Sequence, residues 1–440
     1  MPTTPAPAKS TVAKPTIATS AGGAAAGASG VASLPLARTV TAREINEVAA
    51  TIRDAAATAT PVYPWGGATS LDYGLPAKTP GVGLALNELT RVIDYPARDM
   101  TVTVEAGMTV AELARTLAAE RQQLPFDVPR AGQATVGGVV ATNWNGPRRY
   151  GYGSVRDYVI GISAVDGRGT PFKGGGRVVK NVAGYDFCKL LTGSLGSLGV
   201  ITQLTFRLRP LVERTAWIGC GVATLADAER LLASLVTSAT TPTAIELLAG
   251  PEWRGAARLA ACGPAQAWVL VQVEGDEVET AWMIEQLKTE WHSEGVKNVV
   301  VWQDADASAW SSTLAEYSQQ AASPLVVQGA VRPSGTTALV ATLQQVDPEV
   351  SVQCHAGNGL VLGRFSQFPA AGMSRAVVGG LQSAAAASGG SLVIVSNPSG
   401  QESTIRAVWG VGGATYDVMT QVKRQFDPAN VLNTGRFVFP

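Results

Sequence analysis

The chain has 440 residues, of which 46% are hydrophobic, and this length and composition predict a globular protein of two or three domains. Its 34 basic and 34 acidic side chains cancel, which argues against nucleic acid or an acidic membrane as a partner and favours a small ligand or a protein. The four cysteines stand far apart with no C-x-x-C pair, so neither a disulfide framework nor a cysteine-held iron–sulfur cluster is expected, and a reducing cytoplasm is the simplest location.

The N-terminal segment, residues 1–34, is rich in Ala, Pro, Thr and Gly and has no continuous apolar stretch of the length that a signal peptide needs. We expect a disordered tail there. No uninterrupted apolar run long enough to cross a membrane occurs in the chain, so a spanning helix is not expected. A cytoplasmic protein is the resulting expectation, with at most peripheral contact with the inner face of a membrane through partners.

Short strands mixed with single amphipathic helices are expected from residue 35 onward. Thr41 and Glu44 have the spacing of a capping box, as have Thr109 and Glu112, and each pair precedes apolar residues of helical period. Strand patterns occur at 83–86, 92–95, 101–105, 159–165 and 200–208. This mixture indicates an α+β fold.

The first glycine-rich segment is Trp65-Gly66-Gly67-Ala68-Thr69-Ser70, which follows a predicted strand. Consecutive small residues let several backbone N–H groups converge on one anion, so the segment is a candidate cradle for a diphosphate. It lacks the Gly-Lys-Ser/Thr ending of a P-loop, and no G-x-G-x-x-G stands between a strand and a helix. Taken alone, an ordinary tight turn explains the segment equally well.

The second glycine-rich segment runs from Gln133 to Asn143. Small side chains at this density allow the backbone to lie along a flat ligand, and Thr135 and Thr142 can supply hydrogen bonds to it. A glycine-rich loop without a ligand is the structural alternative. The pattern continues through Gly146, Tyr150, Gly151 and Val155.

A third segment, Lys180–Asp186 followed by Leu190–Thr202, makes a family resemblance plain. Over about residues 41–210 the three segments resemble, in this order, the FAD-binding domain of the vanillyl-alcohol oxidase / p-cresol methylhydroxylase (PCMH) family. The resemblance implies that two small α/β subdomains hold FAD between them. It also implies the cofactor-binding residues, which are Trp65, Gly66, Gly67, Ala68, Thr69, Ser70, Pro129, Ala134, Thr135, Gly137, Gly138, Ala141, Thr142, Gly146, Tyr150, Gly151, Val155, Gly199, Val200, Ile201 and Asn433.

After Pro210 the composition turns alanine-rich, which indicates a second domain. Helical patterns lie near 226–236 and 278–292, between strand patterns at 268–273 and 325–331. We therefore expect a PCMH-type FAD-binding domain over 35–212 and an α/β cap domain over 213–403.

The last segment, 404–440, is expected to return to the FAD domain. It carries a helical pattern at 413–425 and then Phe426–Arg436, which resembles the closing motif of FAD-linked oxidases of 2-hydroxy acids. The resemblance implies that Asn433 approaches the cofactor. A simple helix stop and turn is the alternative.

Oxidation of a 2-hydroxy acid needs a base for the hydroxyl proton and a cation for the carboxylate, beside the flavin that accepts the hydride. His355 lies in a stretch that resembles the His-Ala-Gly-Asp-Gly-Asn-Leu-His motif of related dehydrogenases, but Asn358 replaces the aspartate and the second histidine is absent. The sequence therefore predicts no metal site. His355, Arg332 and Arg364 are the candidate catalytic residues; packing or a partner contact for His355, and plain surface positions for the arginines, are the alternatives.

The flavin is expected to be noncovalent, because no histidine lies in 65–74 or 129–157 and Cys188 matches no attachment pattern. Within the family, Leu195 stands where many relatives have glutamate, and this departure together with Lys180–Asp186 resembles the FAD-binding subunits of glycolate oxidases. The resemblance implies a larger FAD subunit and an iron–sulfur subunit as partners, and oxidation of glycolate to glyoxylate. A self-sufficient 2-hydroxy-acid dehydrogenase and a non-catalytic flavin-binding or electron-relay subunit are the alternatives.

Overall fold

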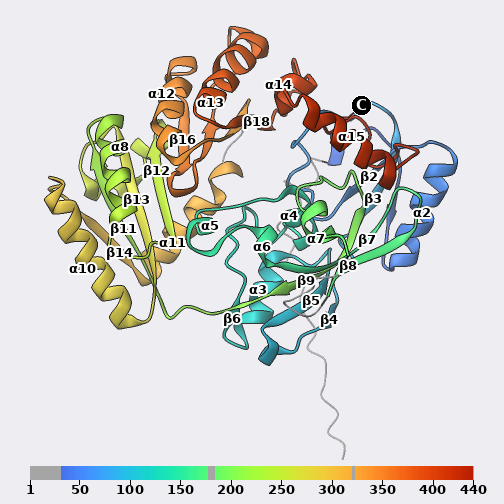
Figure 1. Cartoon of the computed structure of the whole chain (residues 1–440), viewed down its shortest axis with the longest axis horizontal. Coiled ribbons are helices and arrows are strands. Elements are labelled where there is room, and N and C mark those ends of the chain that lie inside the picture. The colour runs from blue at the N-terminus through green and yellow to red at the C-terminus, as the bar shows by residue number, and fades with distance from the viewer. Residues whose placement is uncertain (1–30, 177–183, 320–322, 440) are drawn as a thin grey trace, which may run out of the picture.

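The computed structural model describes residues 31–176, 184–319 and 323–439. Residues 1–30 of the predicted tail and residues 180–183 of the third predicted segment lie outside the described residues. Figure 1 shows two halves side by side, with the N-terminal half drawn in blue to green and the second half in yellow-green to orange. The C-terminal helices, in red, lie over the N-terminal half.

The N-terminal half begins with a three-stranded parallel sheet in the order β1 (Leu36–Thr41), β3 (Gly81–Ala85), β2 (Val62–Trp65). Helix α2 (Ile45–Ala57) packs on this sheet through the buried Val48 and Ile52. The capping box predicted at Thr41 is wrong by three residues. Thr41 is the last residue of β1 and pairs with Ala85, so Glu44 becomes the N-cap, with Glu47 as its partner.

An antiparallel sheet of five strands forms the second subdomain, in the order β4 (Val92–Asp94), β5 (Thr101–Glu105), β9 (Val200–Arg207), β7 (Val159–Val165), β8 (Pro171–Gly175). It shares one hydrophobic core with α3 (Val110–Ala118), α4 (Val136–Thr142), α6 (Val155–Tyr158) and α7 (Phe187–Leu191). The capping pair predicted for α3 is confirmed in its first part, because the Thr109 side chain accepts from the Glu112 backbone N–H at 3.2 Å. Leu113 and Leu117 of this helix are buried, whereas Ala114 is exposed.

The second half is built on one antiparallel sheet of eight strands. Their order is β14 (Val300–Gln303), β11 (Arg214–Val222), β13 (Ala267–Gly275), β12 (Ala244–Ala249), β16 (Ser351–His355), β17 (Leu360–Arg364), β15 (Val326–Ala330), β18 (Ser391–Ser396). A two-stranded pair, β6 (Gln122–Gln123) with β10 (Arg209–Pro210), precedes β11. The mixed helix-and-sheet fold class predicted from the sequence is confirmed.

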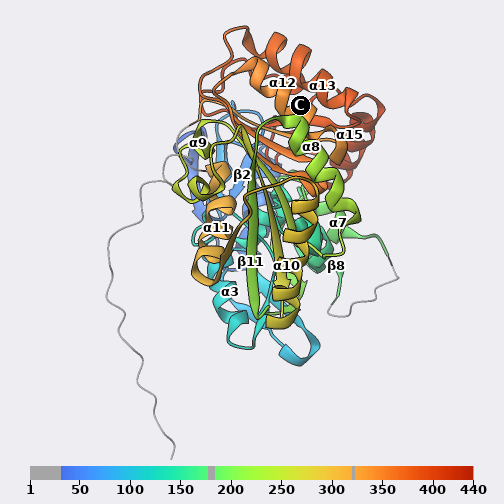
Figure 2. The same cartoon turned by 90° about the vertical axis from the view of Figure 1, so that its left-hand side faces the viewer.

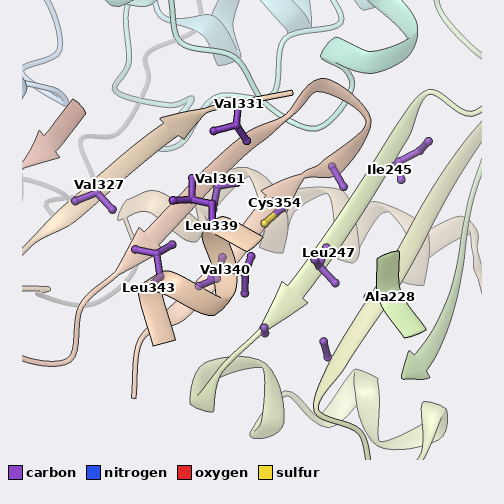
Figure 3. Packing of buried hydrophobic residues seen from close by; sticks show 14 of the residues in the cluster. Ala228, Ile245, Leu247, Val327, Val331, Leu339, Val340, Leu343, Cys354 and Val361 are labelled. Carbon is purple, nitrogen blue, oxygen red and sulfur yellow. The ribbon is translucent and has the colours of Figure 1, made fainter. Parts of the chain in front are cut away.

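Helices cover both faces of the eight-stranded sheet. On one face lie α8 (Leu225–Ser234), α10 (Glu277–Ser293), α12 (Thr336–Val346), η7 (Ser374–Gln382) and α13 (Ser383–Ala387). Figure 3 shows this packing, with Leu339, Val340 and Leu343 of α12 against the strands. The other face packs on α9 (Pro251–Arg254) and α11 (Asp304–Glu316), and Figure 2 shows α8 and α10 on the opposite side of β11 from α11.

The chain then returns to the N-terminal half through α14 (Ile405–Trp409) and α15 (Ala414–Phe426). The helix predicted at 413–425 is confirmed within a residue. After it, Val62 of β2 donates to the Val431 carbonyl at 2.7 Å and accepts from the Asn433 backbone N–H at 3.0 Å. The buried Lys423 Nζ donates to the Ser197 carbonyl, the Asp427 carboxylate and the Leu432 carbonyl at 2.6–2.9 Å, which ties the last helix to the first half.

Within the described ranges, no helix is both long and apolar enough to cross a membrane.

Candidate functional site

A pocket lies between the two subdomains of the N-terminal half. Its lining comprises Leu86, Ala106 and four longer stretches of chain: the turn after β2, residues 128–144, residues 195–201 and residues 433–437. The predicted cofactor residues that line it are Trp65, Gly66, Gly67, Ala68, Thr69, Ser70, Pro129, Ala134, Thr135, Gly137, Gly138, Ala141, Thr142, Val200, Ile201 and Asn433.

The turn after β2 offers a row of free backbone donors. None of the N–H groups of residues 66–70 donates to an acceptor in the part of the chain that the structure describes. Ala68 adopts a left-handed conformation, with φ 55°, which turns neighbouring N–H groups toward one concavity. A Cβ on Gly67 would overlap the backbone carbonyl of Gln133, so glycine is needed for the close approach of the two segments. This arrangement fits an anionic group such as a diphosphate.

Helix α4 forms the second wall of the pocket. Thr135 caps it by accepting from the Gly138 N–H at 3.3 Å, and the Thr142 hydroxyl donates to the Gly138 carbonyl at 2.9 Å. Both hydroxyls are thus used within the helix, although the sequence suggested hydrogen bonds to a ligand. A Cβ on Gly137 would press on Ala106 of the loop after β5, so this glycine allows the helix to pack closely on the sheet.

The returning C-terminal segment closes the pocket. Asn433 has φ 48° and donates through Nδ2 to the Leu195 carbonyl at 2.6 Å, while its buried Oδ1 has no partner in the described structure. Arg436 donates to the backbone carbonyls of Leu71, Leu75 and Tyr73. Burial lowers the pKa of Arg436. The orphaned Asn433 oxygen is a group that a bound cofactor can satisfy.

Several lining residues were missed from the sequence. They are Pro64, Leu71, Tyr73, Leu86, Ala106, Val128, Val139, Trp144, Leu195, Gly196, Arg436 and Phe437. Arg436 belongs to the closing motif itself, so that motif was the available signal for it. The apolar residues carry no local signal of this kind.

Five predicted cofactor residues do not line the pocket. Tyr150 packs against Gly357 of the second half, and the Gly151 N–H donates to the Thr243 carbonyl at 2.9 Å, because the helix that holds them, α5 (Arg149–Tyr152), contacts the eight-stranded sheet. Gly146 packs on Asp127, Val155 is buried in the core, and Gly199 lies near Phe172. Their expected contact with the cofactor is not supported by this geometry.

The three candidate catalytic residues also lie outside the pocket lining. His355 ends β16, and its Nδ1 lies 2.7 Å from Oε1 of the buried Glu246, whose Oε2 accepts from Gln353 at 2.8 Å. Burial raises the pKa of Glu246, and the neighbouring His355 opposes this shift. Arg364 pairs with the carboxylate of Glu252 at 2.7 Å, and Arg332 is exposed.

Glu246 lies on the same face of β12 as Leu248, which packs in one cluster with Trp144 of the N-terminal half. Elsewhere on the sheet, Glu274 of β13 accepts from the Tyr152 hydroxyl at 2.6 Å and lies 3.7 Å from Arg148 Nη1. Burial raises the pKa of Glu274, while Arg148 lowers it. The interface between the halves is therefore polar, and its charged groups partner one another.

Comparisons with known proteins agree with this architecture. The family model described as "FAD binding domain" matches residues 36–175, and the model described as "FAD linked oxidases, C-terminal domain" matches 211–341 and 408–437. The fold is that of p-cresol methylhydroxylase, whose substrate-bound crystal structure covers 91% of this chain and 88% of its own, with a TM-score of 0.69 and 14% identity. A chitooligosaccharide oxidase covers 93% of both chains with a TM-score of 0.65 and 15% identity.

The molecule is thus a flavoprotein of the p-cresol methylhydroxylase fold with an FAD-binding domain. It belongs to the FAD-linked oxidases and dehydrogenases, and the family and the cofactor predicted from the sequence are confirmed.

Curated relatives match part of the chain. A D-2-hydroxyglutarate dehydrogenase of Xanthomonas citri pv. viticola is 37% identical over 164 residues, which are 37% of this chain and 35% of the relative. The cytochrome-type mitochondrial D-lactate dehydrogenase of Arabidopsis thaliana is 35% identical over 43% of this chain and 33% of its own. The glycolate oxidase subunit GlcE of Escherichia coli (strain K12) is 39% identical over 120 residues, 27% of this chain and 34% of the relative. The chain thus spans about a third of the length of these relatives.

Proposed function

We propose that this chain is the FAD-binding subunit of a complex that oxidises a 2-hydroxy acid, with glycolate going to glyoxylate. By their names, the curated relatives act on D-2-hydroxyglutarate, D-lactate or glycolate, which share the 2-hydroxy-acid group. One of them is named as a subunit of glycolate oxidase. FAD supplies the hydride acceptor, at flavin N5, and electrons leave through an iron–sulfur partner.

One observation carries the subunit assignment: the pocket suits a flavin but holds no base. Among its described lining residues the only titratable side chains are Tyr73 and Arg436. Burial raises the pKa of Tyr73 to about 12, so its hydroxyl stays protonated at neutral pH. The Arg436 guanidinium is already bonded to backbone carbonyls. A proton acceptor for the substrate hydroxyl must therefore come from elsewhere, and a larger FAD subunit is the proposed source.

The same lining supports a noncovalent cofactor, because no histidine or cysteine occurs among the described lining residues. Nor does any group of three or more His, Cys, Asp or Glu in the described chain suit a metal ion. An iron–sulfur centre on a partner subunit is consistent with this.

A self-sufficient dehydrogenase is the second candidate, favoured by the Glu246–His355 pair. A histidine oriented by a buried carboxylate through Nδ1 has the arrangement of a general base. On this alternative the substrate would sit between the pocket and β16, and Glu246 would act as a positioning residue for His355.

Anaerobic visible spectra of the purified chain decide between the two. We expect a flavin band that glycolate, D-lactate and D-2-hydroxyglutarate leave unbleached, and that glycolate bleaches once the partner subunits are added. Bleaching of the isolated chain by any of the three acids would overturn the subunit proposal. In that case His355→Asn should abolish bleaching while FAD content stays unchanged, and Arg332→Gln, an exposed change, is the matched control.

A further inference from the structure

We propose that the outer face of helix α10 is a docking surface for a basic protein partner. The surface consists of Val278 and Trp282 together with the acidic side chains around them. Figures 1 and 2 show α10 on the outer side of the second half, at the end of the molecule away from the N-terminal half. No residue of α10 lines the flavin pocket, so the inference goes beyond the proposed function and does not depend on it.

Helix α10 is apolar on two opposite faces. Its inner face packs on the eight-stranded sheet through Met283, Leu287 and Trp291, which are at most 1% exposed. Because the helix has about 3.6 residues per turn, Val278 and Trp282 lie on the opposite side, where they are 79% and 52% exposed. A surface helix is normally polar on the side away from the core. A valine and a tryptophan four residues apart on that side therefore indicate contact with a molecule outside this chain.

Trp282 is the residue best suited to anchor a partner. All ten tryptophans of the chain lie in the described residues, and only Trp282 is more than half exposed. Tryptophan is enriched among the residues that contribute most to protein–protein binding, because one side chain supplies a large apolar area with few rotatable bonds. Val236, on the turn η2 (Leu235–Thr237) after α8, is 81% exposed and adds apolar area beside α10. Three residues further on, the Ala239 N–H donates to Glu290 of α10 at 3.0 Å.

Acidic side chains surround the apolar pair. Five acidic residues and one lysine occur between the N-cap and the last turn of α10: Asp276, Glu277, Glu279, Glu285 and Glu290, with Lys288. Among the described residues only Glu277 and Glu285 of these acids form ion pairs, with Arg214 at 3.9 Å and Lys288 at 2.7 Å. The surface therefore carries a local negative charge, although the chain as a whole is neutral.

This charge selects the occupant of the surface. A second copy of the chain would bring two acidic faces together, and an anionic lipid surface or a nucleic acid would be repelled in the same way. A protein segment with apolar residues on one side and lysines or arginines along its edges fits both features. Its apolar residues cover Val278 and Trp282, and its cations meet Glu277, Glu279 and Glu285. Salt weakens such a contact, because the charges lie at the surface.

A synthetic helical peptide of leucine and lysine, with all its leucines on one face, is the probe for this surface. Fluorescence anisotropy of the labelled peptide, titrated with the full chain, should show saturable binding of one peptide. Trp282→Ala should weaken this binding at least about tenfold, and Val278→Ala to a smaller extent. Val418→Ala, the same substitution at an exposed position of α15, is the matched control and should leave the affinity unchanged.

The charges are tested separately. Glu277→Gln combined with Glu279→Gln should weaken binding and flatten its dependence on salt concentration, and a peptide with glutamate in place of lysine should not bind. Every substituted residue is exposed, so the fold should persist, and circular dichroism of each variant checks it.

Equal affinity of the wild type and Trp282→Ala, or equal binding of the acidic peptide, would overturn the proposal. Self-association of the wild type that Trp282→Ala abolishes, measured by sedimentation, would assign the surface to a second copy instead. Binding to phosphatidylglycerol vesicles that Trp282→Ala abolishes would assign it to a membrane, and either result would also overturn the proposal. None of these measurements involves flavin reduction or a hydroxy acid, so their outcome leaves the proposed function untouched.

Discussion

The flavin pocket of the N-terminal half and the buried carboxylates of the second half differ in how their polar groups are partnered. In the flavin pocket, backbone N–H groups of residues 66–70 and Oδ1 of Asn433 have no partner among the described residues. In the second half, Glu246 and Glu274 of the eight-stranded sheet and Glu252 of α9 are each bonded to a side chain at 2.6–2.7 Å. Because an unpaired buried polar group is costly, the first pattern indicates a place kept for a ligand and the second a self-contained interface.

The largest effect is expected at the cradle. Gly67→Ala should abolish FAD retention, because its Cβ would overlap the Gln133 carbonyl and force the turn away from the segment before α4. Flavin absorbance per chain after gel filtration measures it. Gly132→Ala is the matched control, since a Cβ there meets nothing within 4 Å. Full FAD content in Gly67→Ala would refute the close approach.

On the paired side, Glu246→Ala should lower the free energy of unfolding by about 3 kcal/mol, since it strips the acceptor from both His355 and Gln353 in a buried site. Denaturant titration of the FAD-free chain gives this number. Glu246→Gln should cost far less, because the Gln353 amide can turn over and offer its unpartnered Oε1 to the new amide. Equal losses in the two variants would contradict the pairing.

The Glu246 carboxyl also leads us to predict how the stability of the protein depends on pH. Burial raises the pKa of Glu246, so the folded protein keeps this proton over a pH range in which the unfolded chain has lost it. The contribution of Glu246 to stability therefore falls as the pH rises through that range. The stability of the wild type relative to Glu246→Gln should decline from about pH 4 upward. A flat difference would show that the carboxyl ionises normally.

A smaller effect is expected at the cap of α4. Thr135→Val removes the oxygen that accepts from the Gly138 N–H and should cost about 1 kcal/mol of stability, with FAD content unchanged. Thr135→Ser keeps the oxygen and serves as the control. Loss of FAD without loss of stability would mean that the hydroxyl binds the cofactor instead.

The predicted segments that are built from backbone groups line the pocket, for a physical reason. A cradle made of N–H groups needs small residues in an unbroken run, and Trp65–Ser70 and the segment before and within α4 show such runs locally. The closing motif likewise located Asn433 in the pocket lining. The extension of the second segment through Tyr150 and Gly151 did not line the pocket, because glycine also serves close packing between the two halves.

The side-chain pairs that join distant segments could not be predicted from the sequence. Glu246 and His355 lie 109 residues apart and meet only because β12 and β16 are neighbours in the sheet. The N-cap of α2 is Glu44 and not the predicted Thr41 for a similar reason, since pairing with Ala85 extends β1 over Thr41. Local spacing carries no record of either strand pairing, which is set by distant segments.

The return of the chain to β2 has a consequence for biosynthesis. Asn433, Arg436 and Phe437 complete a pocket whose first wall, Trp65–Ser70, is made some 360 residues earlier. A ribosome must finish nearly the whole chain before the pocket can close, so the cofactor cannot be held in its final form by a nascent N-terminal half. A chain truncated before Asn433 would lack this part of the pocket lining, so we expect it to retain no FAD and to be colourless.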